Sequence, residues 1–189
     1  GAFFGIAALA ADQMLKAGSC KCPPGYESQP TKIVRLGDSL IGVPGSDAHL
    51  RVLRSLAQNH ADKFDLSSVD SIFESFRGIH KLLVEDYYLL TKENDEEQPY
   101  ESSQLNLLIA NRTGIYEVEG YREVIQYERC WATGSGYRFA LGAMEALYAD
   151  DRLTAQQIAQ RGVEIACLFD DASGPPAETH TIVLEETHG

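Results

Sequence analysis

The order of strand-like and helix-like segments constrains the fold of this chain more strongly than any other sequence feature. Six short apolar runs are predicted to be strands, namely residues 1–11, 32–36, 39–43, 105–109, 115–118 and 179–184. The first is small and apolar throughout, which is typical of a strand buried on both faces. Gly37-Asp38 and the turn at 111–114 each separate two of these runs, so we expect two hairpins.

Helical spacing of apolar residues appears in four segments that come in two pairs. In the first pair, Ser46 is a candidate N-cap, and its helix carries Leu50, Leu53, Leu56 and Ala57 at helical spacing. The second helix is predicted to begin near Ser68 and to bury a stripe of Val69, Ile72, Phe73, Phe76, Ile79, Leu83 and Tyr87.

The second pair of helices lies in the C-terminal part of the chain. Residues 137–148 form the first of them, directly after a Gly-Ser-Gly. A capping box that starts at Thr154 begins the other, and we expect Ile158, Ile165 and Phe169 to point inward from it. Residues 18–30 and the acidic stretch 92–103 are predicted to be loops.

The segments therefore run as strands, two helices, strands, two helices and a strand. Hairpins and paired helices that come in blocks predict sheets covered by helix layers, whereas alternating βαβ units would predict a parallel sheet. We expect an α+β fold, a four-layer αββα sandwich. In it two hairpin-built sheets face each other, each covered by one helix pair. The length of 189 residues fits a single domain, 1–189.

Charge and cysteine content exclude several classes of protein. The chain has 16 Lys and Arg against 28 Asp and Glu, a net charge of −12, and no basic run that would bind nucleic acid. Its four cysteines are too few for a disulfide scaffold, and Cys20 and Cys22 are most simply two thiols in a loop. No apolar run approaches the roughly 18 residues of a membrane span, and no signal peptide is evident, so we expect a cytoplasmic protein.

Five local patterns along the chain have the order and approximate spacing found in one known family. They are Ala10-Ala11-Asp12, Lys32 at the head of the run 31–36, Gly45, Thr133-Gly134-Ser135-Gly136, and the stretch 167–174 (CLFDDASG). In the order and spacing of these patterns, which extend over nearly the whole chain, the sequence resembles proteasome β subunits and bacterial HslV, which are N-terminal nucleophile (Ntn) hydrolases. The resemblance implies a threonine-type endopeptidase.

In that family the nucleophile is the hydroxyl of an N-terminal Thr, and the α-amine of the same residue is the general base. The resemblance assigns Lys32 the role of a cation beside that amine, and Asp12 the role of holding the lysine charged and oriented. Ser135 would complete the hydrogen bonds around the amine, and the Gly45 N–H would be the oxyanion donor. The remaining matched positions, Asp170 and Ser173, would support the amine.

The resemblance also implies a cation and several partners. A monovalent or divalent cation (Na or Mg) would bind through the Cys167 carbonyl, Asp170 and Ser173, whereas peptide cleavage itself would require no cofactor. The family cleaves peptides and proteins as homo-oligomeric stacked rings, often fed by a partner ATPase. No nucleic-acid or membrane partner is expected.

The nucleophile itself is not visible in the chain. In this sequence 11 residues precede Asp12, whereas the family pattern has roughly five more before the corresponding Asp. Gly1 has no side chain and cannot be the nucleophile. We expect a Thr upstream of Gly1. The alternatives are an inactive, proteasome-like structural subunit and an Ntn amidohydrolase that acts on a small amide. The segment between Asp12 and Lys32, which includes Cys20 and Cys22, has the character of an insertion that either reshapes the pocket rim or is idle.

Overall fold

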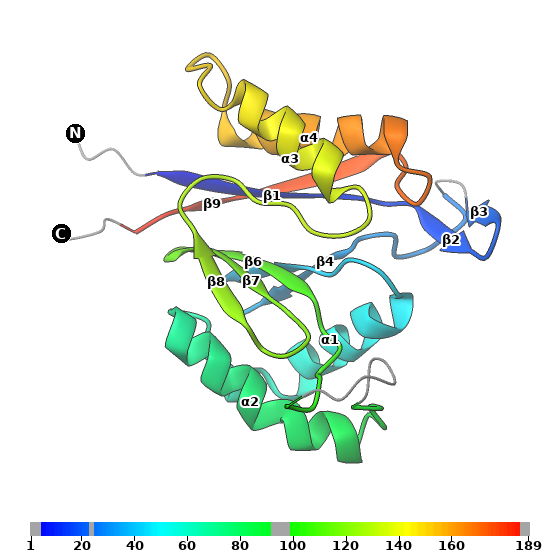
Figure 1. Ribbon diagram of the computed structural model, residues 1–189, viewed down its shortest axis with the longest axis vertical. Helices are drawn as coiled ribbons and strands as arrows, with labels where there is room; N and C mark the ends of the chain where they lie inside the picture. The colour runs from blue at the N-terminus through cyan, green and yellow to red at the C-terminus, as the bar shows by residue number, and fades with distance from the viewer. Residues whose placement is uncertain (1–4, 23–24, 92–98, 186–189) are drawn as a thin grey trace.

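Four layers of secondary structure are stacked in the computed structural model, which describes residues 5–22, 25–91 and 99–185 (Figure 1). Helices α3 (Tyr137–Leu147) and α4 (Ala155–Phe169) form one outer layer, and α1 (Asp47–Asn59) and α2 (Val69–Glu85) form the other. Two sheets lie face to face between them. The predicted αββα sandwich is confirmed.

The sheet beside α1 and α2 has five antiparallel strands in sequence order. They are β4 (Ile33–Leu36), β5 (Ser39–Gly42), β6 (Leu107–Asn111), β7 (Gly114–Val118) and β8 (Val124–Tyr127). Both predicted hairpins form, β4–β5 and β6–β7. They lie in the same sheet, however, so the expectation that each hairpin builds a separate sheet was wrong. The short strand β8 was not predicted, because its four residues, Val-Ile-Gln-Tyr, are too few to show a clear alternation of apolar and polar positions.

The sheet beneath α3 and α4 pairs the two ends of the chain. In it β1 (Ile6–Asp12) runs antiparallel to β9 (Ala177–Val183), with Asp12 opposite Ala177 and Ile6 opposite Val183. A separate small hairpin, β2 (Leu15–Ala17) with β3 (Cys20–Cys22), extends beyond this sheet. Residues 20–22 were predicted to be loop, so this prediction was wrong there. Residues 1–4 of the first predicted strand lie outside the described residues.

Local caps begin the helices where the sequence predicts them. The Ser46 side chain accepts a hydrogen bond from the N–H of Ala48 at the start of α1, and Ser68 caps α2 through the N–H of Ser71. Thr154 and Gln157 form the reciprocal capping box of α4. A short 3-10 turn, η1 (Ala61–Lys63), connects the first two helices. Of the predicted acidic loop, residues 92–98 lie outside the described part of the chain.

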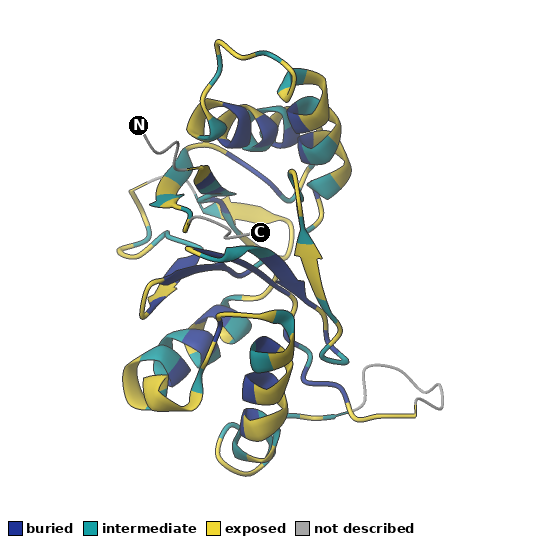
Figure 2. Cartoon of the chain, turned by 90° about the vertical axis from the view of Figure 1, so that its left-hand side faces the viewer, coloured by how far each residue is buried: buried dark blue, intermediate teal, exposed yellow. Residues whose placement is uncertain are grey.

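The main core lies between α1, α2 and the five-stranded sheet, where buried residues cover the facing surfaces (Figure 2). Phe76 is completely buried there, and its ring meets Phe64 edge-on with the ring centroids 5.7 Å apart. A second cluster lies between the two sheets and includes Leu9, Leu40 and Leu108. Within the described residues, no helix is both long and apolar enough to cross a membrane.

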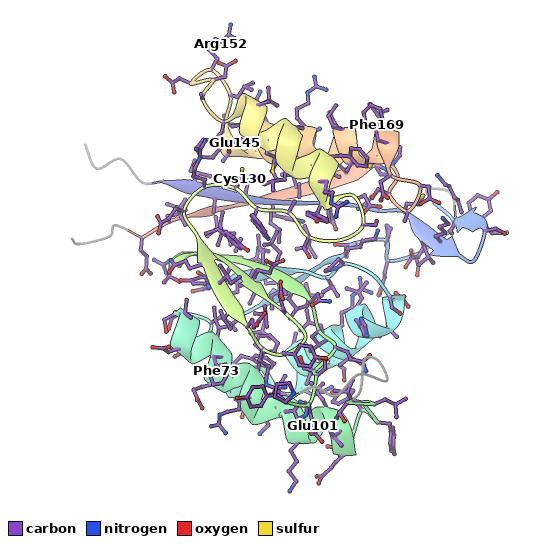
Figure 3. All side chains as sticks on the ribbon, in the orientation of Figure 1. Phe73, Glu101, Cys130, Glu145, Arg152 and Phe169 are labelled. Atoms are coloured by element: carbon purple, nitrogen blue, oxygen red, sulfur yellow. The ribbon has the colours of Figure 1, made fainter. Side chains whose placement is uncertain are left out.

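Two aromatic residues predicted to be buried lie at the surface instead. Phe73 is 40% exposed on α2, and Phe169 is 67% exposed at the end of α4 (Figure 3). Both fall at helical spacing from buried residues, but the apolar stripe is narrower than the spacing alone indicates. Phe169 packs against Phe139 of α3, with ring centroids 5.5 Å apart.

Candidate active site

An ion pair joins the two sheets at the end of β1. The Nζ atom of Lys32 lies 2.8 Å from Oδ1 and 2.9 Å from Oδ2 of Asp12, so the contact is bidentate. Only 22% of the lysine side chain and 15% of the aspartate side chain are exposed. The pair therefore sits largely out of water, where a lone charge would be costly. The two residues lie in contact, as the resemblance to the Ntn hydrolases implies.

Backbone N–H groups complete the environment of Asp12. Its Oδ2 atom accepts from the N–H of Met14 at 3.1 Å and from the N–H of Gly174 at 3.2 Å. These donors come from the chain just after β1 and from the loop before β9. A carboxylate with several donors and a bidentate cation is held in one orientation. Lys32 is thereby directed toward the end of β1.

A second polar cluster lies at the C-terminal end of α4. The hydroxyls of Ser135 and Ser173 both donate to Oδ2 of Asp170, each at 2.6 Å. Gly136 makes this approach feasible, because a Cβ there would lie 2.9 Å from the Cβ of Ala166 and 3.1 Å from the Ser173 hydroxyl. Three of the predicted site residues are thus joined at one atom, because Ser135 and Ser173, from distant segments, both donate to the same oxygen of Asp170.

Two opposing effects set the pKa of Asp170. Partial burial would by itself raise it, because desolvation disfavours the charged carboxylate. The hydrogen bonds from Ser135 and Ser173 lower it, and smaller contributions come from the Ala172 N–H and the charge of Lys16. The lowering effects prevail, so the pKa of Asp170 lies below its ordinary value. Asp170 is therefore an anionic anchor at neutral pH.

This lowered pKa predicts a pH dependence of stability. A carboxyl group with a depressed native pKa stabilises the fold above its unfolded pKa of about 3.9, and this contribution is lost as pH falls through the native pKa. We expect Asp170→Asn to lower the free energy of unfolding at pH 7, and we expect the difference from wild type to shrink below about pH 4. Urea unfolding at several pH values measures this.

The neighbouring Asp171→Asn variant is the matched control. Asp171 is 86% exposed and contacts Lys16 at 2.9 Å, and such an exposed ion pair contributes little to stability. We expect a smaller effect of this variant at every pH. If Asp170→Asn lowers the free energy of unfolding by the same amount from neutral to strongly acidic pH, the pKa of Asp170 is not lowered by the native fold.

A cavity of about 1010 Å³ opens beside both clusters. Its lining includes Asp12, Lys32, Gly45, Ser135 and Ser173, so five of the six predicted catalytic residues border one space. Gly45 has φ +88°, a left-handed conformation that strongly favours glycine, and nothing would touch a Cβ there. The backbone at Gly45 is thus open to a bound molecule.

The cavity follows one edge of β1. Consecutive residues from Ala8 to Met14 line it, whereas no residue of β9 does. Among the described strands β1 pairs only with β9, so the edge of β1 that borders the cavity has no strand partner there. The cavity therefore offers a row of backbone groups suited to a further extended segment.

The cavity lining also includes Trp131 and the carboxylates Glu117 and Glu119. Trp131 stacks on Tyr127 with ring centroids 4.2 Å apart, and its indole Nε1 is buried without a hydrogen-bond acceptor in the described part of the chain. Tyr127 donates to Glu117 at 2.8 Å, and burial followed by this hydrogen bond raises the pKa of the tyrosine. Burial also raises the pKa of Glu119, with further contributions from Glu123 and Glu117.

The three positions expected to bind a cation lie within the last turn of α4 and the loop that follows. Burial raises the pKa of the Cys167 thiol, and the nearby Asp12 carboxylate adds to this effect, so the thiol is a poor metal ligand. The hard donors left are one backbone carbonyl, one carboxylate and one hydroxyl, which suit a weakly held cation. Among the described residues, no group of three or more His, Cys, Asp and Glu side chains is arranged to hold a metal. The four cysteines form no disulfide.

Comparison with known proteins identifies the family. The ATP-dependent protease subunit HslV of Bacillus cereus (strain B4264) is 31% identical over 144 residues, which cover 72% of this chain and 73% of the relative. HslV of Bacillus anthracis (strain CDC 684 / NRRL 3495) matches with the same figures. The chain belongs to the HslV-like family of N-terminal nucleophile hydrolases. A scan against models of known protein families finds no match.

Solved structures agree with this HslV-like assignment. Thiobacillus denitrificans BPH in complex with epoxomicin is 36% identical and superposes with a TM-score of 0.84, covering 96% of this chain and 95% of that one. Eukaryotic HslV from Trypanosoma brucei, at 21% identity and a TM-score of 0.70, shares the fold over 94% of each chain. The relatives named HslV are subunits of an ATP-dependent protease.

Sequence reasoning missed two contributors to this HslV-like site. Gly174 supplies an N–H to Asp12, and Glu178 binds the backbone of Lys32. Gly174 lies within the matched stretch 167–174, but the signal was assigned to its side-chain neighbours. Glu178 carries no local signal, because a Glu in a half-exposed strand is ordinary. Leu15 and Lys16, on the first strand of the β2–β3 hairpin, line the cavity, whereas Cys20 and Cys22 are not among its lining residues.

Proposed function

We propose that this chain is the threonine-type endopeptidase subunit of a self-compartmentalised, HslV-like protease. The nucleophile is the hydroxyl of an N-terminal Thr that precedes Gly1, and its own α-amine is the general base. The observation that carries the proposal is the ion pair of Asp12 and Lys32 beside a large cavity that borders the unpaired edge of β1.

The direction of β1 supports this position of the nucleophile. A strand that precedes β1 and pairs with it as a hairpin runs antiparallel, so its first residue lies next to the last residue of β1, which is Asp12. Such a strand would fill the cavity along residues Ala8 to Met14. A backbone carbonyl of that strand would also accept from the buried indole N–H of Trp131.

In the proposed reaction each group has one task. The α-amine takes the proton of the Thr hydroxyl as the oxygen attacks the peptide carbonyl, and the ammonium of Lys32 favours the neutral form of that amine. The N–H of Gly45 donates to the oxyanion. The protonated amine then gives its proton to the leaving amine, and water hydrolyses the acyl-enzyme in a second, equivalent cycle. Asp170 orients Ser135 beside the amine.

Partners follow from the named relatives. HslV of Bacillus cereus is the subunit of an ATP-dependent protease. We therefore propose that this chain assembles into stacked homo-oligomeric rings, cleaves peptides and unfolded proteins, and works in the cytoplasm with an ATPase. A cation held by the Cys167 carbonyl, Asp170 and Ser173 is also proposed, as a structural aid to the loop after α4.

Peptide hydrolysis by the protein that includes the residues before Gly1 tests the proposal. We expect its mature N-terminus to be Thr, and we expect it to cleave fluorogenic peptides. Epoxomicin, the compound in the Thiobacillus denitrificans structure, should block this activity and add its mass to the first residue. Replacing that Thr by Ala is the control and should abolish both effects.

Other outcomes would support the alternatives. A protein that assembles by native mass spectrometry but cleaves no peptide favours a structural subunit. Cleavage of small amides without cleavage of peptides favours an amidohydrolase.

A further inference from the structure

We propose that Glu178 is a positioning residue that holds Lys32 at the reacting centre. The proposal rests on the proposed function, and it concerns a residue on β9 that takes no part in the chemistry itself. Its basis is two hydrogen bonds that the Glu178 carboxylate, on β9, accepts from Thr31 and Lys32, the two residues just before β4 of the other sheet.

The carboxylate binds the chain directly at Lys32. Oε1 of Glu178 accepts from the backbone N–H of Lys32 at 2.9 Å and from the Thr31 hydroxyl at 2.5 Å. Only 13% of the Glu178 side chain is exposed. Hydrogen bonds to a carboxylate are stronger than neutral ones, and their strength increases away from water. The head of β4 is thus tied to β9 at the residue that carries the catalytic cation.

Register places this tie beside the ion pair. In the β1–β9 sheet, Asp12 is opposite Ala177, and Ala11 is opposite Glu178. The β1–β9 sheet therefore contacts Lys32 at two points. Glu178 accepts from its backbone N–H, and Asp12 pairs with its Nζ. A free lysine side chain has many rotamers, and fixing both ends restricts them. The position of Nζ is then set by the sheet and not by the lysine alone.

The outer helix layer adds a second restraint on the same segment. Nη2 of Arg54, on α1, donates to the carbonyl of Thr31 at 2.7 Å. Thr31 is thereby held between α1 on one side and Glu178 on the other. In the part of the chain that the structure describes, the ion-pair contact of the Glu178 carboxylate is with His180, whose Nε2 lies 3.7 Å from Oε2. No basic side chain is placed closer to Glu178 among the described ion pairs, so its charge is available to the two hydrogen bonds on Oε1.

Glu178→Ala is the principal test, in the full protein that carries the leading Thr. A displacement of about 1 Å costs up to roughly 10²-fold in rate, so we expect kcat for peptide hydrolysis to fall about 10- to 100-fold while KM changes less than about threefold. The acid limb of the pH profile should move to higher pH, because a displaced ammonium favours the neutral α-amine less. Glu178→Gln keeps an acceptor oxygen and should stay within about threefold of wild type.

Glu185→Ala is the matched control. Glu185 follows β9 and pairs at 3.2 Å with Arg112, in the turn between β6 and β7, so it also links β9 to the other sheet, but at the opposite end of β9. We expect unchanged kcat and an unchanged pH profile. Thr31→Val removes one of the two donors to Glu178 and should give an intermediate loss, which keeps the test valid if Glu178→Ala folds poorly.

A readout that needs no catalysis separates this proposal from the proposed function. The rate at which an amine-acylating reagent modifies Lys32, followed by mass spectrometry, should rise at least severalfold in Glu178→Ala and not in Glu185→Ala. If wild type cleaves no peptide but this rise occurs, the protease proposal fails and the positioning role stands. If Lys32 reactivity, kcat and pH profile all match wild type, Glu178 does not position Lys32.

Discussion

Peptide hydrolysis falls by at least about 10³-fold when Lys32 is replaced by Met, because the cation that favours the neutral general base is removed. The Nζ atom of Lys32 is held by two contacts of 2.8 and 2.9 Å to Asp12, so the cation has a fixed position that Met cannot supply. We expect KM to change much less than kcat, since the ammonium acts on the reacting groups. Steady-state kinetics on a fluorogenic peptide measure both.

Stability measurements separate this effect from unfolding. Lys32→Met leaves Asp12 largely buried without its cation, which costs about 2–3 kcal/mol, less than the value for fully buried pairs because 15% of Asp12 is exposed. Asp12→Asn combined with Lys32→Met should recover most of that stability and none of the activity. Lys81→Met is the matched control, since Lys81 is 81% exposed and distant in sequence from the site. Retention of more than a tenth of the activity by Lys32→Met would sink the assignment.

Phe76→Ala is expected to have the largest effect on stability, about 3–5 kcal/mol. The ring is completely buried between α2 and the five-stranded sheet and meets Phe64 edge-on, so its removal leaves a cavity and breaks an aromatic pair. Natural domains are stable by about 5–15 kcal/mol, so this variant approaches the limit of folding. Urea unfolding followed by circular dichroism measures the loss.

Phe73→Ala is the matched control on the same helix. Phe73 lies three residues earlier in α2 and is 40% exposed, so we expect a loss below about 1 kcal/mol. The ratio of the two losses therefore reports which side of α2 faces the sheet. Equal losses in the two variants would mean that α2 is rotated relative to the sheet.

Much of the fold was predictable because its signals are local. Ser46, Ser68 and Thr154 cap their helices through groups two or three residues away, so sequence spacing alone identifies these helix starts. The two hairpins are equally local, since their turns contain the residues that such turns need. Phe169 was misassigned because helical spacing indicates a face but not how wide the covering layer is.

The candidate site also has one part that the sequence predicted and another that only the tertiary structure decided. From the sequence alone came the residue types and their order: Asp12, Lys32, Gly45, Ser135 and the stretch 167–174. Only the tertiary structure brought Ser135 to Asp170 and attached Glu178 to Lys32, across separations of 35 and 146 residues. The packing of α3 against α4 decided the first contact and the packing of one sheet on the other decided the second, and no local pattern encodes packing between distant segments.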